Sequence, residues 1–150
     1  MDSGDHPRTL DPREGLGHAW QWFSLHAGQR MQCVNFYLLA TGFLVAGFGT
    51  AVTAKQFAIA GTIAALGAWL TVLFHALEIR TRELVKAGEA ALRKAERSLA
   101  EATEVREFMI VESVEKPKIG WSSYSCVIRA LHATTFVVFL IGAIFAFKHP

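Results

Sequence analysis

Two long apolar blocks stand back to back near the middle of the chain. No acidic or basic side chain occurs in residues 31–54 or in residues 56–77, and Lys55 separates the two blocks. At about 1.5 Å of rise per residue, such helices reach roughly 36 and 33 Å, more than the about 30 Å of a hydrocarbon core. The pattern therefore predicts a transmembrane helical hairpin over residues 31–77.

A third uncharged run covers residues 130–147. Its length is short but sufficient for a further transmembrane helix. The sequence thus predicts an all-α membrane protein with a hairpin and a third span. A re-entrant or interfacial segment is the alternative for residues 130–147.

The chain before the first span divides into two parts. Residues 1–13 carry three aspartates and two prolines with few apolar side chains, which predicts a disordered tail. In residues 14–30 the apolar positions recur at spacings of three and four, as in an amphipathic helix. We expect this helix to lie on the membrane surface and then turn into the first span.

Aromatic side chains flank the predicted spans. Trp20 and Trp22 precede the first span, and Trp121 and Tyr124 precede the third. Indole and phenol rings favour the headgroup level of a bilayer. All four residues are therefore predicted interfacial anchors.

Residues 78–110 are rich in charge and predict a long amphipathic helix that continues the second span into the cytoplasm. Its apolar and small residues alternate at spacings of three and four, like a heptad seam. We expect the seam to join subunits, with packing against the N-terminal helix of the same chain as the alternative. The seam consists of Val85, Gly88, Leu92, Ala95, Leu99, Ala102 and Met109. Pro117 and Gly120 then mark residues 111–129 as a linker.

Both hairpin helices carry small residues at four-residue spacing, such as Gly42 and Ala46 in the first and Gly61 and Ala65 in the second. Small residues let helix backbones approach closely in lipid. They predict close packing of the two hairpin arms, contacts between subunits, or both of these at once.

The distribution of positive charge predicts the orientation. Thirteen of the fifteen lysines and arginines lie before the first span or between the second and third spans, and Lys55 and Lys148 lie on the other side. The positive-inside rule therefore places the N-terminus and residues 78–129 in the cytoplasm and the C-terminus outside. A net charge of +2 is too small to argue for nucleic acid.

Several polar residues near the predicted membrane boundaries are candidates for a site. His26 and Arg30 follow Trp22 at four-residue steps, and this cluster could bind a lipid phosphate or a partner carboxylate, or simply snorkel to the interface. Asn35 lies one turn inside the first span, where it could line a pore or, as we favour, bridge two helices.

His75 and Glu78 form a second candidate, at the cytoplasmic end of the second span. His132 lies near the same depth in the third span. These groups could share a proton, whereas the missing second histidine and carboxylate pair argues against a metal site. The alternative is a salt bridge from Glu78 to Arg82 or Arg129 that orients the second and third spans.

No motif for catalysis is present: there is no glycine-rich phosphate loop, no cysteine pair with zinc spacing and no nucleophile elbow. The sequence therefore predicts a protein without enzymatic activity, cofactor or bound metal.

Residues 16–82 resemble the RipA-type family of small bacterial membrane proteins, which is described as octameric. The resemblance rests on Trp20 and Trp22, on His26-Ala27-x-Gln29-Arg30, and on Asn35-Phe36 ahead of a two-span hairpin. It implies a homo-oligomer in the bacterial inner membrane. The hairpin with its cytoplasmic helix also looks like the two-span effector modules of bacterial defence systems, in architecture alone.

Two functions remain open from the sequence. The first is an oligomeric pore or gated channel in a stress or defence response. The second is a non-conducting scaffold or adaptor whose helix recruits a cytoplasmic protein. The expected partners are thus the lipid bilayer, further copies of the chain and, for the scaffold, a cytoplasmic protein, without nucleic acid.

Overall fold

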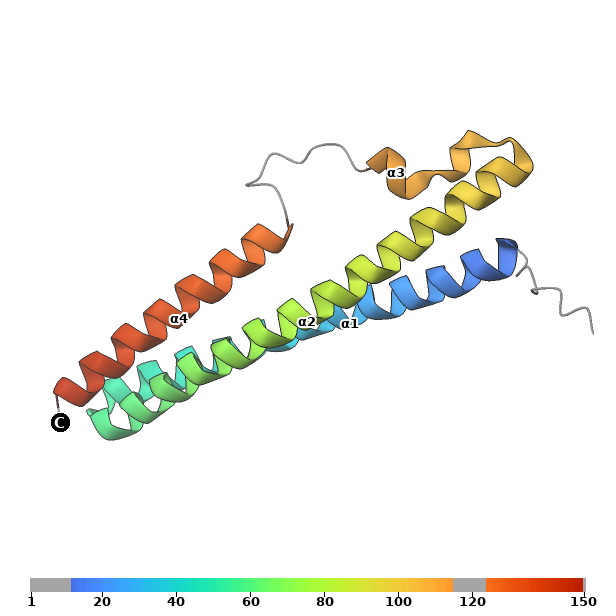
Figure 1. Cartoon of the computed structure of the whole chain (residues 1–150). Helices are drawn as coiled ribbons and strands as arrows, with labels where there is room; N and C mark the ends of the chain where they lie inside the picture. The colour runs from blue at the N-terminus through green and yellow to red at the C-terminus, as the bar shows by residue number, and fades with distance from the viewer. Residues whose placement is uncertain (1–11, 115–123, 150) are drawn as a thin grey trace, which may run out of the picture. The chain divides into compact units, whose positions relative to one another are not determined.

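A computed structural model describes residues 12–114 and 124–149, and these residues form helices without any strand. The elements are α1 (Pro12–Thr53), α2 (Phe57–Thr103), the 3₁₀ helix η1 (Arg106–Phe108), α3 (Ile110–Val114) and α4 (Tyr124–Lys148) (Figure 1). They divide into two compact units. The bundle unit comprises Gly28–Arg82 and Pro117–Pro150, and the fold-back unit comprises Met1–Ala27 and Glu83–Lys116.

Three of the helices are long and apolar enough to cross a membrane. Their best 18-residue windows have mean hydropathies of 1.6, 2.0 and 2.1, and 11%, 28% and 22% of these windows is buried. Most of this apolar surface therefore faces outward, as in Phe43, which is 77% exposed. Residues 130–147 lie within α4, which has 25 residues and is longer than the sequence indicated.

Helix α1 runs without a break from Pro12 to Thr53. The expected turn between a surface helix and the first span, after Arg30, is therefore absent. The physical reason is that residues 28–34 contain no proline and only one glycine, so nothing in the backbone ends the helix there. The loss of charge after Arg30 marks a change of surroundings and not a change of backbone.

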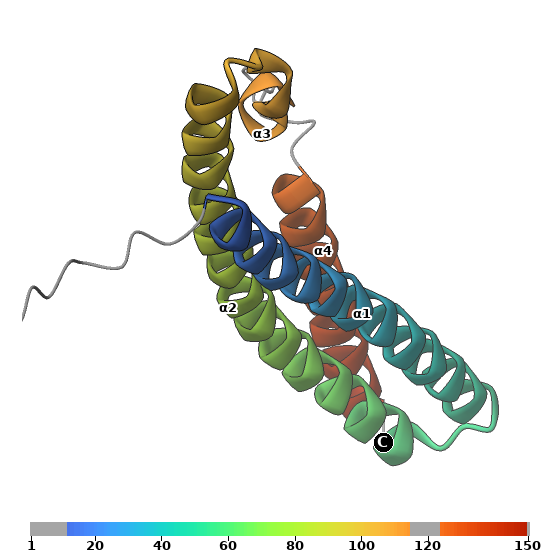
Figure 2. The same cartoon turned by 90° about the vertical axis from the view of Figure 1, so that its right-hand side faces the viewer.

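Lys55 ends α1 by adopting a left-handed conformation, with φ of 58°. The Gln56 N–H donates to the Ala51 carbonyl and the Lys55 N–H donates to the Val52 carbonyl, each at 2.9 Å. These two bonds form a Schellman motif, in which glycine is the usual residue at the left-handed position. The turn lets α2 begin at Phe57 and run back beside α1 (Figure 2). Ala51 of α1 and Ala60 of α2 belong to one buried cluster.

The bundle unit is held together by phenylalanine rings that fill gaps beside small residues. Phe139 and Phe147 of α4 cover Gly67 and Gly61 of α2, and Phe48 of α1 covers Gly142 of α4. Ala64, Ala68 and Ala143 complete the buried core around Phe139. Gly61 and Gly67 of α2 therefore pack against α4 within one protomer, whereas the intramolecular use expected from the sequence was packing of the two hairpin arms on each other.

In the fold-back unit, α1 and α2 approach closely at Gly88. A Cβ at this position would lie 3.0 Å from Trp22 Cδ1 and 3.2 Å from Phe23 Cα. The indole Nε1 of Trp22 also donates a hydrogen bond of 3.4 Å to the Leu84 carbonyl. Absence of a side chain at Gly88 is what permits this contact.

The predicted seam is occupied largely by the protomer itself. The first three members, Val85, Gly88 and Leu92, are buried. Ala102 is exposed, and the other three are half-buried: Ala95, Leu99 and Met109. Intramolecular packing, the alternative interpretation from the sequence, therefore accounts for the first half of the seam.

Helix α2 ends at Thr103, before the expected end at Ile110, because Glu104 adopts a left-handed φ of 59°. The chain then returns along α2 through η1 and α3 (Figure 1). The buried Glu96 carboxylate accepts a 3.0 Å hydrogen bond from the Val111 N–H, and Arg97 Nε donates to Glu112 Oε2 at 3.0 Å.

The expected tail and linker are covered only in part. Residues 1–11 and 115–123 lie outside the described residues, and with them Trp121. Part of the predicted linker 111–129 is helical, since α3 includes residues 111–114 and α4 begins at Tyr124.

The packing at Gly67 yields a first prediction. A Cβ there would lie 2.6 Å from Phe139 Cε1, and Phe139 is only 3% exposed, so Gly67→Ala overpacks the bundle. We expect a loss of about 1–3 kcal/mol in the free energy of unfolding. Denaturing-detergent titration followed by tryptophan fluorescence measures it. Gly47→Ala is the matched control, because its Cβ would meet Ile63 at an ordinary 3.6 Å; equal losses in both variants would contradict the packing argument.

The return of α3 along α2 yields a second prediction. The hydrogen bond and positive charge of Arg97 hold the pKa of the Glu112 carboxyl below its ordinary value of 4.5. A lowered pKa means that the contact stabilises the fold above that value and is lost as the pH falls through the lowered pKa. We expect amide protection in α3 to fall between about pH 5 and about pH 3, as measured by hydrogen exchange.

Glu112→Gln should start with lower protection of α3 at the higher pH and lose less on acidification. The neighbouring Glu107→Gln, in the exposed η1 helix, serves as the control and should behave like the unmodified protein. An unchanged acid response in Glu112→Gln would assign the effect to other groups.

Candidate functional site at two stacked polar layers

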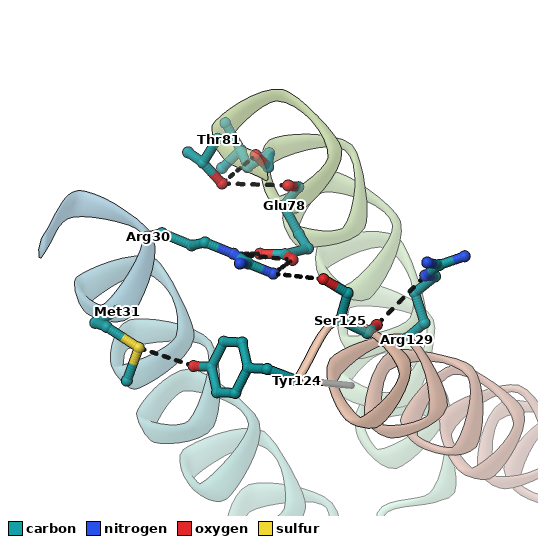
Figure 3. A network of polar contacts seen from close by, with 8 residues as sticks. Arg30, Met31, Glu78, Thr81, Tyr124, Ser125 and Arg129 are labelled. Atoms are coloured by element: carbon teal, nitrogen blue, oxygen red, sulfur yellow. Dashed lines mark hydrogen bonds and ion pairs between the residues drawn. The ribbon is translucent and has the colours of Figure 1, made fainter. Parts of the chain in front are cut away.

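A buried ion pair lies where the three helices of the bundle unit meet. Arg30 Nε on α1 donates to both carboxylate oxygens of Glu78 on α2, each at 3.1 Å, and Arg30 Nη2 contacts Oε1 as well. The same Nη2 donates to Ser125 Oγ on α4 at 3.2 Å (Figure 3). One guanidinium thus connects all three helices.

Tyr124 completes this first layer. The Arg30 Cζ lies 5.0 Å from the centroid of the Tyr124 ring, and the Tyr124 hydroxyl donates to the sulfur of Met31 (Figure 3). The Arg30 and Glu78 side chains are only 12% and 6% exposed. Such a desolvated, bidentate pair is among the stronger polar contacts in proteins, and breaking it leaves a buried charge.

A second polar layer lies one heptad away on each helix. On α1, Tyr37 lies seven residues after Arg30, and on α4, His132 lies seven residues after Ser125. On α2, Thr71 lies seven residues before Glu78. The Tyr37 hydroxyl lies 3.4 Å from Thr71 Oγ1, and the Tyr37 ring meets the His132 ring edge-on with centroids 4.4 Å apart. All three residues of this layer are buried.

The structure brings His75 and His132 together, as their predicted depths suggested. Their ring centroids are 5.6 Å apart, from α2 and α4. Glu78 does not join them, because its oxygens bind Arg30. Among the described residues, no group of three or more His, Cys, Asp or Glu is placed to hold a metal ion.

The expectation that Glu78 forms a salt bridge with Arg82 or Arg129 is therefore wrong, because its partner is Arg30. Arg129 Nε instead donates to the Ser125 carbonyl of its own helix at 3.3 Å (Figure 3). Arg82 Nε is buried without a hydrogen-bond partner among the described residues. The side chain that reaches Glu78 comes from α1, which the spacing of residues within α2 and α4 could not reveal.

The members of the predicted cluster of Trp22, His26 and Arg30 have different side-chain partners. His26 stacks on Trp22 at 4.3 Å between centroids, and its Nδ1 lies 2.8 Å from the Trp22 carbonyl, both in the fold-back unit. Arg30 belongs to the bundle unit and binds Glu78. Of the predicted anchors, Trp20, Trp22 and Tyr124 are 56%, 42% and 43% exposed.

Asn35 lies on an outward face of α1. At about 100° per residue, this face is opposite the side that carries the buried Tyr37 and Ala51. The Asn35 side chain is exposed and forms no hydrogen bond with any described residue. This face also carries the exposed apolar side chains of Met31 and Leu39. Its small or polar members are all exposed: Gly28, Asn35, Gly42, Ala46, Gly49 and Thr53. We call this set the α1 outer stripe.

Sequence reasoning missed three members of the polar layers: Ser125, Tyr37 and Thr71. A signal existed, because each stands seven residues from a polar residue of the other layer on the same helix. Hydroxyl groups at heptad spacing within apolar runs indicate a repeated inward position.

The fold and these layers define an all-helical protein with three helices that are long and apolar enough for membrane insertion. The chain is similar to CD-NTase-associated protein 19 of Escherichia coli, with 36% identity over 81 residues, which is 53% of this chain and 54% of that protein. The chain thus matches about half the length of this curated relative. No family model and no solved structure matches the chain.

The buried ion pair yields a third prediction. Glu78→Gln leaves the Arg30 charge buried without a counter-ion, and we expect it to cost about 3–5 kcal/mol of unfolding free energy. Replacing both partners, in Arg30→Met with Glu78→Leu, should restore most of this loss because no charge then remains buried. The same detergent titration reports both. The control is Glu83→Gln at an exposed position of α2; a Glu78→Gln effect no larger than the control's would argue that the pair is solvated.

Proposed function

We propose that this chain forms a homo-oligomeric pore or gated channel in the bacterial inner membrane, with subunits meeting along the α1 outer stripe. One observation carries the proposal: Asn35 and the glycines of the α1 outer stripe are exposed and point away from their own protomer. Asn35 lies in this stripe, and a Cβ at Gly28, Gly42 or Gly49 would meet nothing within 4 Å.

The energetics of lipid support a contact at this stripe. A carboxamide that faces hydrocarbon without a partner is costly, whereas an amide between helices is stabilised by about 1–2 kcal/mol in model peptides. Small residues along the same line allow a second backbone to approach closely. In contrast, large apolar side chains such as Phe36, Leu38 and Phe43 lie beside the stripe and suit contact with lipid tails.

In a ring whose subunits meet beside this stripe, Asn35 and Thr53 would lie toward the centre of the ring. Polar atoms at intervals along an otherwise small-residue surface are compatible with a narrow pore that is closed or plugged at rest. The resemblance noted above implies eight subunits. The proposal includes no catalytic step and no cofactor.

The proposed orientation follows the positive-inside rule, with the N-terminus and residues 78–129 in the cytoplasm. The relative's name describes a protein that is associated with a CD-NTase, and the hairpin with its cytoplasmic helix looks like defence effector modules in architecture. We therefore place the proposed pore in a bacterial defence response, in which an upstream signal opens it.

A second candidate is a scaffold that recruits a cytoplasmic protein. It is favoured by apolar side chains of the fold-back unit that are exposed around η1 and α3: Val105, Phe108 and Ile110 are 36%, 42% and 61% exposed. Under this alternative the oligomer does not conduct, and Phe108→Ser with Ile110→Ser abolishes capture of a cytoplasmic partner while leaving the oligomer intact.

Cysteine cross-linking in membranes is the fourth prediction, and it tests the subunit contact. Cys33 and Cys126, both free, are first replaced by alanine. Asn35→Cys should then form disulfide-linked dimers on oxidation, because the stripes of neighbouring subunits come together toward the centre of the ring. Phe36→Cys is the matched control, since it is 62% exposed and lies at the same depth but about 100° around the helix. Equal cross-linking of both variants would remove the stripe as the interface.

Conductance of the purified oligomer in planar bilayers, together with dye release from liposomes, separates the two functions. We expect conductance that falls about tenfold in Asn35→Leu, the equivalent of roughly 1.4 kcal/mol, and is retained in Phe36→Leu. A correctly assembled ring that conducts under no condition would favour the scaffold.

A further inference from the structure

A cavity of about 220 Å³ lies between α2 and α4 of the bundle unit. Thr71, Val72 and His75 line it from α2, and Arg129, His132 and Phe136 line it from α4. Its wall is therefore largely apolar, with one guanidinium and two imidazoles as its charged or ionisable groups. Neither the ion pair nor the α1 outer stripe uses this cavity.

The charge of this region is unbalanced. Residues 28–82 and 117–150 contain seven lysines and arginines but one acidic residue, Glu78. Because Glu78 is bound by Arg30, no carboxylate of this unit is left for Arg129. Among the described residues, Arg129 forms one hydrogen bond, from its Nε to the Ser125 carbonyl, and its terminal nitrogens point away from Arg30 and Glu78 (Figure 3). Arg129 is exposed, so its terminal nitrogens are accessible to an anion from outside the protein.

The two histidines provide further unpaired groups. His75 Nδ1 and His132 Nδ1 are buried and have no hydrogen-bond partner in the described part of the chain. His132 is only 4% exposed, so water does not readily replace a partner. A buried polar atom that stays unpaired costs about 1–3 kcal/mol. A ligand with several acceptor oxygens, placed beside Arg129, can satisfy a ring N–H once an imidazole turns toward it.

We propose that this cavity binds one anionic phospholipid, with its phosphate at Arg129 and His75 and an acyl chain along Val72, Ala133 and Phe136. The apolar wall selects a ligand that carries a chain, because a hydrated inorganic anion gains nothing from these side chains. Arg129 selects a net negative headgroup over a zwitterionic one. The inference rests on the membrane location in the proposed function, but it requires no pore.

The site fits the proposed orientation. Arg129 lies at the end of the bundle that also holds Arg80 and Arg82, which the positive-inside rule assigns to the cytoplasmic leaflet. Anionic lipids attract such basic side chains at the membrane surface by about 1 kcal/mol each. The neighbouring cavity turns this general attraction into a defined position for one lipid.

The test is native mass spectrometry of the detergent-purified full chain with phosphatidylglycerol or phosphatidylcholine of the same acyl chains. We expect one phosphatidylglycerol per subunit to bind at least about tenfold more tightly than phosphatidylcholine, and Arg129→Gln to abolish this preference. Arg80→Gln is the matched control, because it removes the same charge from an exposed position outside the cavity. Equal loss in both variants would overturn the proposal in favour of general surface attraction.

A second pair of variants tests the acyl-chain part. Ala133→Phe fills the cavity while leaving Arg129 in place, and should lower the phosphatidylglycerol affinity about tenfold. Ala130→Phe, which adds the same ring at an exposed position outside the cavity, should not. Inorganic phosphate that displaces the lipid, together with normal binding in Ala133→Phe, would overturn a lipid site in favour of a phosphate site.

Circular dichroism melting of each variant in detergent establishes that its fold is retained. Arg129 forms no hydrogen bond or ion pair outside its own helix among the described residues, so Arg129→Gln should melt like the control. Lipid binding is read from mass alone and needs no conductance. A non-conducting protein that still prefers phosphatidylglycerol would thus refute the pore and leave the lipid site standing.

Discussion

The bundle unit depends on a single carboxylate. Glu78 is the one acidic residue in residues 28–82 and 117–150, and Arg30 binds it in a geometry that α1, α2 and α4 must share. A displacement of α1 or α2 by one turn, about 5.4 Å, would leave a charge buried without its partner, and a displacement of α4 would remove the Ser125 hydroxyl from Arg30. Apolar packing alone tolerates such slips far better, so the ion pair fixes which residues of the three helices lie at one level.

Phenylalanine rings and small residues then set the distance between the helices. The glycines of α2 and α4 are covered by aromatic rings of the neighbouring helix, whereas the glycines of the α1 outer stripe are open. The same residue type therefore has two uses on one chain. On α2 it makes room for a ring inside the protomer, and on α1 it leaves a surface that, in the proposed assembly, a second subunit fills. This contrast connects the packing of the bundle to its function.

The three polar features of the bundle have different roles. The Arg30–Glu78 pair joins helices, the α1 outer stripe is proposed to join subunits, and the cavity beside Arg129 is proposed to hold a lipid. Their separation follows from charge: the ion pair neutralises Glu78 completely, so Arg129 stays available to an external anion. In a membrane, lipid at this cavity would contact α2 and α4 while subunits contact α1, and both contacts can exist at once.

The sequence by itself determined the three apolar helices, the continuation of α2 beyond its apolar part and the turn at Lys55, because hydropathy and charge vary along the chain itself. It left open whether the small residues and the seam serve one protomer or several. Only the tertiary structure decided that Gly67, Gly88 and Leu92 pack within the protomer and that Glu78 binds Arg30 and not Arg82 or Arg129. The physical reason is that three arginines compete for one carboxylate, and the winner depends on which helix faces meet, a relation between segments far apart in sequence that no local period contains.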